Sequence, residues 1–219
     1  MFLTRFDINA QRRDARKLLG SPQAMHAAVL AGFPPTTSAD GAGRILWRLD
    51  SIGPANTLYV LSPERPDLTH LVEQAGWPTT KSGWQTKDYQ PLLDSLATGQ
   101  RWGFRLTANP TKSVKLRAED ERSQRYGHVT AAQQQAWFSD RLVRLGISIA
   151  KNEAGYDELS LRDREQKAFK REGKTVTLTT AVFEGVLVVE DAAALTTALV
   201  GGIGPAKAYG CGLMTLARL

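Results

Sequence analysis

The sequence predicts an α+β fold built from two consecutive units, each with the order strand, helix, strand, strand, helix, strand. Three observations lead to this prediction. Short apolar segments with strand periodicity alternate with segments that carry helix-start and helix-stop residues. The same order occurs in both halves, without sequence identity between them. The chain has 219 residues, 42% of them hydrophobic, which suffices for two domains of about 100 residues each.

The N-terminal half opens with residues 1–8, whose period-two pattern of apolar side chains predicts a strand. Asn9 is a suitable N-cap for a helix over 10–19. Ser21 can cap a second helix, in which Pro22 takes the first helical position. The other elements expected in this half are strands at 43–50 and 56–62, a helix at 66–76 and a strand at 101–110.

The residue pattern of the C-terminal half predicts a similar order of helices and strands. Thr130 caps a helix that ends at Gly146, with Trp137, Leu142 and Leu145 facing inward. The elements expected after it are several strands within 147–191, a helix at 192–202 and a last strand at 212–219.

The N-terminal half thus has the βαββαβ order of the ferredoxin-like fold, and the strands, helix and last strand of the C-terminal half suit a second unit of the same fold. The segment 112–127 is polar and charged, so we expect it to connect an N-terminal domain at 1–111 with a C-terminal domain at 128–219.

Composition limits the classes of partner. The net charge of +6 favours a polyanion. Cys211 is the single cysteine, which excludes an internal disulfide and suits a reducing cytoplasm. The sequence contains no run of about 18 apolar residues, so we expect no membrane span. The N-terminus is too polar for a signal peptide. His26, His70 and His128 lack metal-ligand spacing, so we expect no metal.

The C-terminal glycines form the pattern Gly202-x-Gly204-x-x-Lys207-x-x-Gly210-x-Gly212. They follow a predicted helix and precede a predicted strand, which is the reverse of the dinucleotide-binding order. The pattern also lacks the Lys-Ser/Thr ending of a nucleotide-binding P-loop. Two interpretations remain open: a loop whose backbone approaches a phosphate, and a loop whose glycines serve tight packing.

His26 is the candidate for acid–base chemistry. Small residues flank it, namely Ala24, Ala27 and Ala28, and they leave the imidazole accessible. A histidine near basic groups suits cleavage of RNA through its own 2′-hydroxyl, which needs proton transfer and no metal. The alternative is an ordinary packed or surface histidine of a helix.

The segment 161–174 is rich in cations, and we expect it to form a hairpin that grips a nucleic-acid backbone or groove. Its cations are Arg162, Arg164, Lys167, Lys170, Arg171 and Lys174. A solvated basic hairpin is the alternative. A weaker basic group near the expected connection includes Lys112 and Lys115.

Together these segments resemble the CasE family, the CRISPR RNA-processing endoribonucleases of type I-E Cascade within the RAMP superfamily. The resemblance covers essentially the whole chain and rests on MFLTRFDIN, SPQAMH, RILWRLD, FRLTANPTK, AVFEGVLVVED and GGIGPAKAYGCGLMTLAR. It implies tandem ferredoxin-like domains and metal-independent cleavage of precursor CRISPR RNA at the 3′ base of each repeat hairpin. The products would be a 5′-hydroxyl and a 2′,3′-cyclic phosphate. The RNA would stay bound to a Cascade subunit, with no small-molecule cofactor.

The resemblance places His26 on the family's catalytic histidine and 161–174 on a hairpin that enters the RNA major groove. Gln23 stands where some members have tyrosine, and Ala31 lies where others have a nearby lysine. Gln23 shares a helix face with His26 and could orient RNA by hydrogen bonding, but it is neither acid nor base. Two alternatives then remain: an arginine or lysine from elsewhere assists His26, or cleavage is slow. The alternatives are a non-catalytic RNA-hairpin scaffold of the same complex and an enzyme that binds a nucleotide.

Overall fold

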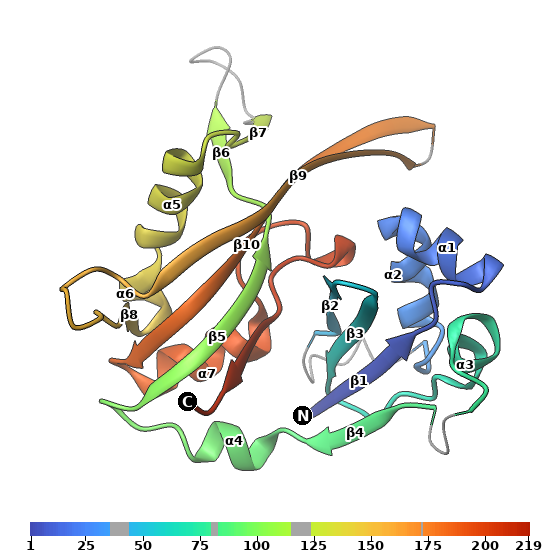
Figure 1. Cartoon of the computed structure of the whole chain (residues 1–219), viewed down its shortest axis with the longest axis horizontal. Helices are drawn as coiled ribbons and strands as arrows, with labels where there is room; N and C mark the ends of the chain where they lie inside the picture. Colours follow the sequence, from blue (N-terminus) through green and yellow to red (C-terminus); the bar gives the residue numbers. More distant parts are fainter. Residues whose placement is uncertain (36–43, 80–82, 115–123, 172) are drawn as a thin grey trace.

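The computed structural model describes residues 1–35, 44–79, 83–114, 124–171 and 173–219. The N-terminal sheet is antiparallel and has the order β2-β3-β1-β4. Its strands are β1 (Phe2–Ile8), β2 (Leu46–Ile52), β3 (Ala55–Ser62) and β4 (Gln85–Asp88). Its helices are α1 (Arg13–Gly20), α2 (Pro22–Leu30) and α3 (Thr69–Ala75). These helices pack on one face of the sheet around a core that includes Phe6, Met25, Val29 and Leu71 (Figure 1).

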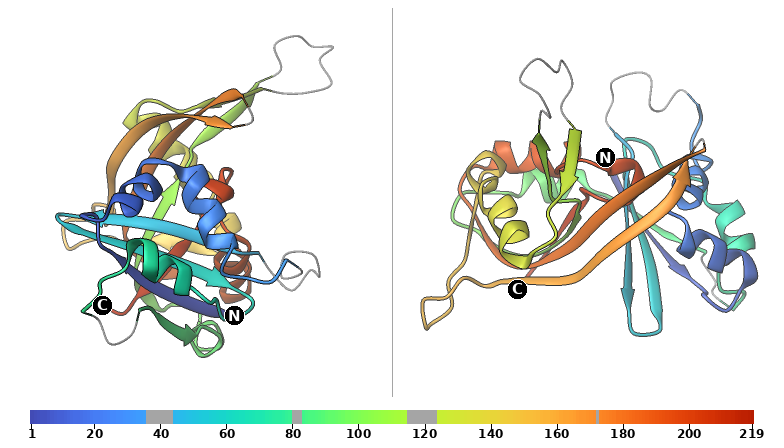
Figure 2. Two further views of the ribbon diagram at one scale, coloured as in Figure 1. Left: turned by 90° about the vertical axis from the view of Figure 1, so that its right-hand side faces the viewer. Right: turned by 90° about the horizontal axis from the view of Figure 1, so that it is seen from above.

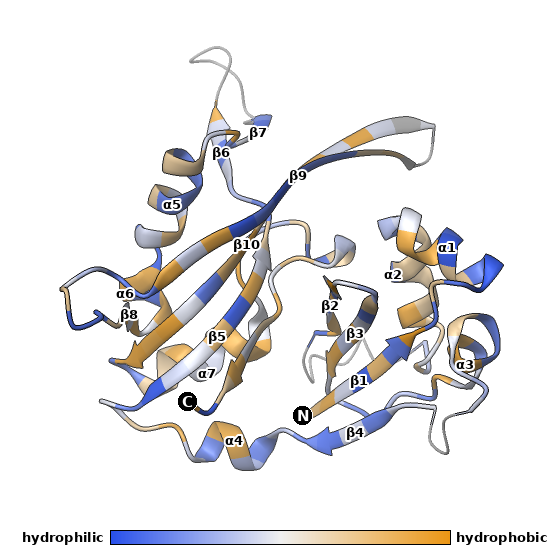
Figure 3. Ribbon diagram, in the orientation of Figure 1, coloured by the Kyte–Doolittle hydropathy of each residue, from blue (hydrophilic) through white to orange (hydrophobic). Residues whose placement is uncertain are grey.

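The C-terminal sheet has the order β11-β5-β10-β8, with β9 paired to β10. Its strands are β5 (Arg101–Ala108), β8 (Ile147–Ile149), β9 (Leu159–Arg171), β10 (Lys174–Val189) and β11 (Met214–Ala217). Its helices are α5 (Ala131–Ser139), α6 (Leu142–Leu145), α7 (Ala192–Gly201) and the short 3₁₀ helix η1 (Lys207–Tyr209). Figure 3 colours the C-terminal half of β10 mainly as hydrophobic, where this strand crosses the core.

In the N-terminal sheet β1 lies between β3 and β4, with β2 at one edge. In the C-terminal sheet β5 lies between β10 and β11, with β8 and β9 paired to the other edge of β10. Together with the helices between the strands, this is the ferredoxin-like arrangement, so the predicted tandem fold is confirmed. In the described part of the chain, no helix is long and apolar enough to cross a membrane.

The strand at 101–108 was expected to complete the N-terminal unit, and this assignment is wrong. β5 pairs with β10 and β11 of the second sheet, while β4 closes the first. The sequence of β4, QTKD, is short and polar, and it does not show strand periodicity. The two sheets therefore divide before residue 101. They are joined by a stretch that contains the helix α4 (Gln90–Asp94), whose Leu93 is buried in the C-terminal core.

The segment expected as the connection, 112–127, begins and ends in a hairpin of the C-terminal half. Strand β6 (Thr111–Val114) pairs with β7 (Gln124–Gly127), while residues 115–123 lie outside the described residues. The hairpin follows β5 directly, so it extends the C-terminal unit and does not join two domains.

The helix expected over 130–146 begins as predicted and is interrupted once. Thr130 forms a capping box with Gln133, and Gly146 ends the segment in the left-handed conformation at φ 68°. Between them, α5 ends at Ser139 and the short α6 follows. Trp137 and Leu145 are buried as expected.

The two units share a packed interface. Leu46 and Leu61 belong to the N-terminal sheet, yet they are buried in the C-terminal core. The β9–β10 hairpin extends beyond its own sheet toward the N-terminal helices (Figure 2). The inter-domain surface therefore brings parts of both halves of the chain together.

Candidate active site

Helix α2 presents His26 at the side of the N-terminal core. The Ser21 hydroxyl caps the helix by accepting from the Ala24 N–H at 3.2 Å, with Pro22 in the first turn. Met25 and Val29 are buried, so the neighbouring His26 lies at the border of the core and is half-buried. Its position is therefore fixed by local capping and packing.

Trp47 on β2 holds the imidazole ring. Its indole Nε1 donates to Nδ1 of His26 at 3.3 Å. An indole N–H can only donate, so Nδ1 accepts and the neutral ring carries its hydrogen on Nε2. Nε2 is therefore the ring nitrogen that can exchange a proton with a bound molecule.

A cavity of about 690 Å³ brings His26 together with residues that are distant in the sequence. We call it the active-site cavity. Besides His26, it is lined by Leu30 of α2, by Arg44 and Ile45 before β2, by Arg125 of β7 and by residues 204–208 of the glycine-rich loop. Three cations, Arg44, Arg125 and Lys207, thus share a cavity with one histidine, which suits an anionic group. The residues that line it do not include Gln23 or Ala31.

Lys207 has a perturbed environment within this cavity. Its Nζ donates to the carbonyl oxygen of Gly201 at 2.6 Å. Burial, and secondarily the nearby charge of Arg44, lower the pKa of Lys207 below its ordinary value. The backbone contact holds the amine near the end of α7 and close to the cavity.

The glycine-rich loop is explained largely by packing. Gly204 and Gly210 have φ values of +76° and +79°, which favour glycine. A Cβ at Gly204 would lie 2.9 Å from the ring of Trp137, and one at Gly210 would lie 2.7 Å from the ring of Trp47. Of the two interpretations that the sequence left open, the structure supports close packing for these glycines. The same packing sets Lys207 beside α2.

Gly202 and Gly212 frame the loop at its two ends. Gly202 is the C-cap of α7, and the Ile203 N–H donates to the carbonyl oxygen of Gly212 at 2.9 Å. The Gly212 N–H in turn donates to the carbonyl oxygen of Thr107 on β5 at 2.8 Å. These bonds attach the loop to the C-terminal sheet.

The cations of the basic segment point in different directions. Arg164 donates to Gln134 Oε1 at 2.7 Å and to the carbonyl oxygen of Val129 at 2.6 Å, which ties β9 to α5. Lys167 pairs with Glu165 at 2.7 Å on the opposite side. Arg162 lies 3.6 Å from Glu184 and remains exposed. The three described cations therefore do not form one continuous surface.

The remaining predicted RNA-binding residues are described only in part. Lys112 lies on β6 opposite Tyr126 of β7. Lys115 lies outside the described residues. Lys170, Arg171 and Lys174 are at the tip of the β9–β10 hairpin, and their side chains are outside the described part of the structure.

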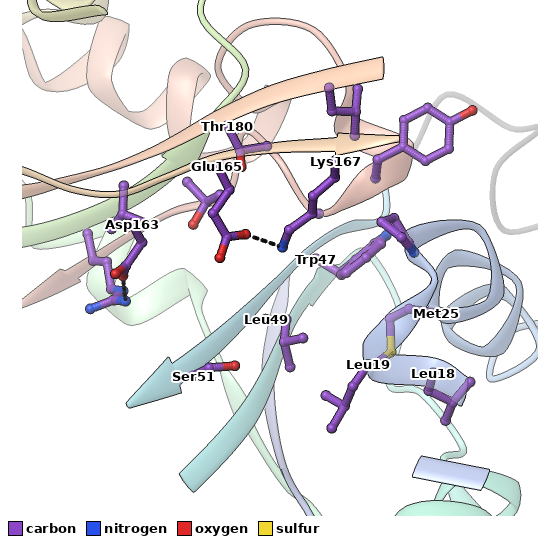
Figure 4. Close-up of a pocket in the computed structure, with 17 residues that line it drawn as sticks. Leu18, Leu19, Met25, Trp47, Leu49, Ser51, Asp163, Glu165, Lys167 and Thr180 are labelled. Carbon is purple, nitrogen blue, oxygen red and sulfur yellow. Dashed lines mark ion pairs between the residues drawn. The ribbon is translucent and has the colours of Figure 1, made fainter. Parts of the chain in front are cut away.

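A second, smaller cavity of about 200 Å³ lies between the β9–β10 hairpin and the N-terminal helices. Figure 4 shows Lys167 and Glu165 paired across from Trp47, Leu19 and Met25. Trp47 lines this cavity and also donates to His26, so its indole lies between the inter-domain space and the active-site cavity.

A buried ion pair that we did not identify from the sequence fixes the two sheets. Arg48 on β2 is 2% exposed and donates to both carboxylate oxygens of Asp50, at 2.8 and 2.9 Å. It also donates to the carbonyl oxygens of Arg105 and Leu213, at 2.7 and 3.0 Å, and to Thr215 Oγ1 at 2.9 Å. The signal in the sequence was an arginine and an aspartate two residues apart within the apolar stretch RILWRLD.

Comparisons with known proteins identify the family of the chain. A model of the family described as CRISPR associated protein matches residues 1–218. The CRISPR-associated endoribonuclease Cse3 of Thermus thermophilus is 31% identical over 224 residues, which cover 99% of this chain and 100% of that protein. The CRISPR system Cascade subunit CasE of Escherichia coli is 29% identical over 196 residues, which cover 79% and 94% of the two chains.

Solved structures show the same likeness in three dimensions. The CRISPR endoribonuclease Cse3 bound to a 19-nt RNA has a TM-score of 0.78 and 29% identity, with 100% of both chains covered. Thermus thermophilus Cse3 bound to an RNA that represents a pre-cleavage complex has a TM-score of 0.77 and 29% identity, with 99% and 98% covered. The family model and the Thermus relative both span nearly the whole chain, and the chain therefore belongs to the CRISPR associated protein family and is homologous to Cse3 and CasE.

Proposed function

We propose that the chain is an endoribonuclease that binds the hairpin of a CRISPR repeat and cleaves precursor CRISPR RNA at the 3′ base of that hairpin. Cleavage uses the RNA's own 2′-hydroxyl and no metal. The product stays bound, and the protein acts as a subunit of a Cascade complex. The names of the homologues, a CRISPR-associated endoribonuclease and a Cascade subunit, support this assignment.

The observation that carries the proposal is the active-site cavity. One histidine and three cations from separate segments line it, so a phosphodiester placed there would meet both a proton-transfer group and positive charge. Arg44, Arg125 and Lys207 take the place of the tyrosine and lysine that the chain lacks near His26. Their role is to stabilise the charge that grows on the phosphate oxygens.

The chemistry follows from these positions. The 2′-oxygen attacks the adjacent phosphorus, its proton passes to water, and the bond to the 5′-oxygen breaks. This leaves a 2′,3′-cyclic phosphate and a 5′-hydroxyl. The leaving 5′-oxygen takes its proton from Nε2 of His26. The ring must first take up a proton at Nδ1, which breaks the hydrogen bond that Trp47 donates there in the free protein. Lys207 and the two arginines remain charged throughout the step.

The decisive experiment is cleavage of the cognate repeat RNA in EDTA. The wild-type protein should cut it, and an RNA with a 2′-deoxy nucleotide just upstream of the cut should resist. The His26→Ala variant should lose about 10²–10⁴-fold in rate and still bind the RNA. His128→Ala is a matched control, since His128 does not line the active-site cavity. Undiminished cleavage by His26→Ala would remove the catalytic assignment.

A non-catalytic RNA-hairpin scaffold is the second candidate, favoured by Gln23 and Ala31 in place of reactive side chains. It predicts tight binding of the hairpin and no product after long incubation, in the presence or absence of divalent metal.

The basic segment 161–174 keeps its proposed role in RNA binding, with a narrower set of contacts. Arg164 already serves to hold β9 to α5, so it contributes less to RNA than Arg162, which remains exposed. Replacing Arg162 should reduce the salt dependence of RNA binding by about 0.9 in log–log slope if it neutralises one phosphate. An unchanged slope would place Arg162 off the RNA.

A further inference from the structure

A cavity of about 200 Å³ lies next to the active-site cavity, and the proposed chemistry does not use it. Asn109, which follows β5, lines it, and we call it the Asn109 cavity. The other residues that carry its chemistry are Arg125, Thr177, Thr179, Pro205 and Tyr209. Arg125, Pro205 and Ala206 line both cavities, so the two spaces share a wall.

The side chain of Asn109 is unusual for its degree of burial. The residue is 7% exposed, and its Oδ1 is buried without a hydrogen-bond partner among the described residues. Buried polar atoms are nearly always paired, because an unpaired one keeps its desolvation cost without compensation. Asn109 also lines the cavity, so a molecule bound there could supply the missing partner once the amide turns toward it.

The walls of the cavity differ in character. Pro205, Leu178 and Tyr209 provide flat or apolar surface, and Phe169 holds the Tyr209 ring edge-on with the centroids 4.9 Å apart. Thr177, Thr179 and the amide of Asn109 provide donors and acceptors. Arg125 adds a cation at the wall shared with the active-site cavity.

This combination fits one chemical class, a single unstacked nucleobase. A base needs flat apolar contacts for its faces and an amide or hydroxyl group for its edge, as in the recognition of single-stranded RNA. We infer that the Asn109 cavity binds the base of a nucleotide adjacent to the phosphate at His26, with Asn109 as the residue that reads its edge. The inference rests on the proposed function, since it requires RNA in the active-site cavity.

The test uses the full chain and repeat RNAs that carry a 2′-deoxy nucleotide at the cut, so that binding is measured without cleavage. An abasic site is placed in turn at each nucleotide flanking the cut, and affinity is measured by fluorescence anisotropy. For wild type, an abasic site at one of these positions should lower the affinity about 5- to 150-fold, the range expected for one amide–base contact. For Asn109→Ala, the affinity for the RNA with this abasic site should be close to the variant's affinity for the intact RNA.

Thr177→Val provides a second variant on the same wall. Thr177 is exposed on a strand, so its replacement leaves the fold intact and keeps the inference testable if Asn109→Ala fails to fold. Its effect should also depend on the base at the sensitive position. Equal losses for wild type and both variants at every abasic site would overturn the inference and leave a cavity that holds water only.

The two proposals fail in different ways. If wild type cleaves the unmodified repeat but no flanking abasic site affects binding, the base site is wrong and the endoribonuclease assignment stands. If wild type neither binds nor cleaves the repeat, the proposed function fails and the base site falls with it.

Discussion

Trp47 donates its indole N–H to Nδ1 of His26 at 3.3 Å, across from β2 to α2. The same indole is 3% exposed, and its ring lies against Gly210 of the glycine-rich loop, where an added Cβ would be only 2.7 Å away. One side chain therefore orients the candidate catalytic ring and sets how closely the C-terminal loop approaches it.

The first prediction concerns the tautomer of His26. In the wild-type protein, ¹⁵N NMR at neutral pH should show Nδ1 as an acceptor nitrogen and the ring hydrogen on Nε2. Trp47→Phe removes the donor, so both tautomers should appear and cleavage should slow about 2- to 12-fold, the range of one hydrogen bond. An unchanged tautomer in Trp47→Phe would show that the indole does not set it.

The second prediction concerns the pH dependence of RNA binding through Lys207. Burial and, secondarily, Arg44 lower the pKa of Lys207, so the amine loses its charge at a lower pH than an ordinary lysine. As the pH is raised, the affinity of wild type for uncleavable repeat RNA should therefore begin to fall at a lower pH than it would with an ordinary lysine at this position. The Lys207→Arg side chain stays charged, so the affinity of this variant should fall less as the pH rises. Parallel curves for the two proteins would contradict a phosphate contact by Lys207.

The third prediction concerns the buried Arg48–Asp50 pair. Arg48→Leu leaves Asp50 buried with part of its pairing lost, although Arg105 Nε still lies 3.2 Å from it. The free energy of unfolding should fall by about 3–5 kcal/mol, or somewhat less because of Arg105, as measured by urea denaturation. Arg101→Ala is the control. Its pair with Glu158 is also 2.8 Å long but Arg101 is about half exposed, so it should cost about 0–1 kcal/mol.

The fourth prediction concerns Tyr89, a buried residue outside the site. Its hydroxyl has no hydrogen-bond partner among the described residues, and burial raises its pKa to about 12. Tyr89→Phe should therefore leave the free energy of unfolding unchanged or raise it by about 1–3 kcal/mol at neutral pH.

The sign of the pH effect at Tyr89 follows from the raised pKa. The folded protein keeps the neutral phenol, so the stability from this group is present below pH 10 and is lost as the pH rises from 10 to about 12. Tyr89→Phe lacks this loss. Denaturation curves of the two proteins at alkaline pH measure the difference, and a destabilised Tyr89→Phe at neutral pH would point to a partner for the hydroxyl.

Features that depend on neighbours in the chain could be predicted from the sequence. Ser21 and Thr130 cap their helices through atoms only three residues away, and Gly146 ends its segment by its own backbone conformation. His26 could be singled out for the same reason, because its exposure follows from the small residues beside it and from the buried Met25 and Val29 on its helix.

Strand pairing could not be read in the same way. The strand at 101–108 was recognised, but its hydrogen bonds go to β10 and β11, more than 70 residues later in the chain. Nothing in its local pattern distinguishes these partners from β1. The sequence pattern of β4 at 85–88 is weak, so the stronger strand pattern at 101–108 is the one that the sequence predicts for the fourth strand of the first sheet.

The sequence by itself determined the order of elements, the tandem ferredoxin-like fold, the basic character of the chain and the candidate histidine, since each depends on residue type and short-range spacing. The tertiary structure alone decided which cations accompany that histidine. Arg44, Arg125 and Lys207 are 18, 99 and 181 residues beyond His26 in the numbering, and only the docking of the two sheets brings them to one cavity. That docking depends on contacts such as those of Arg48 with Leu213 and Thr215, which join residues from opposite ends of the chain.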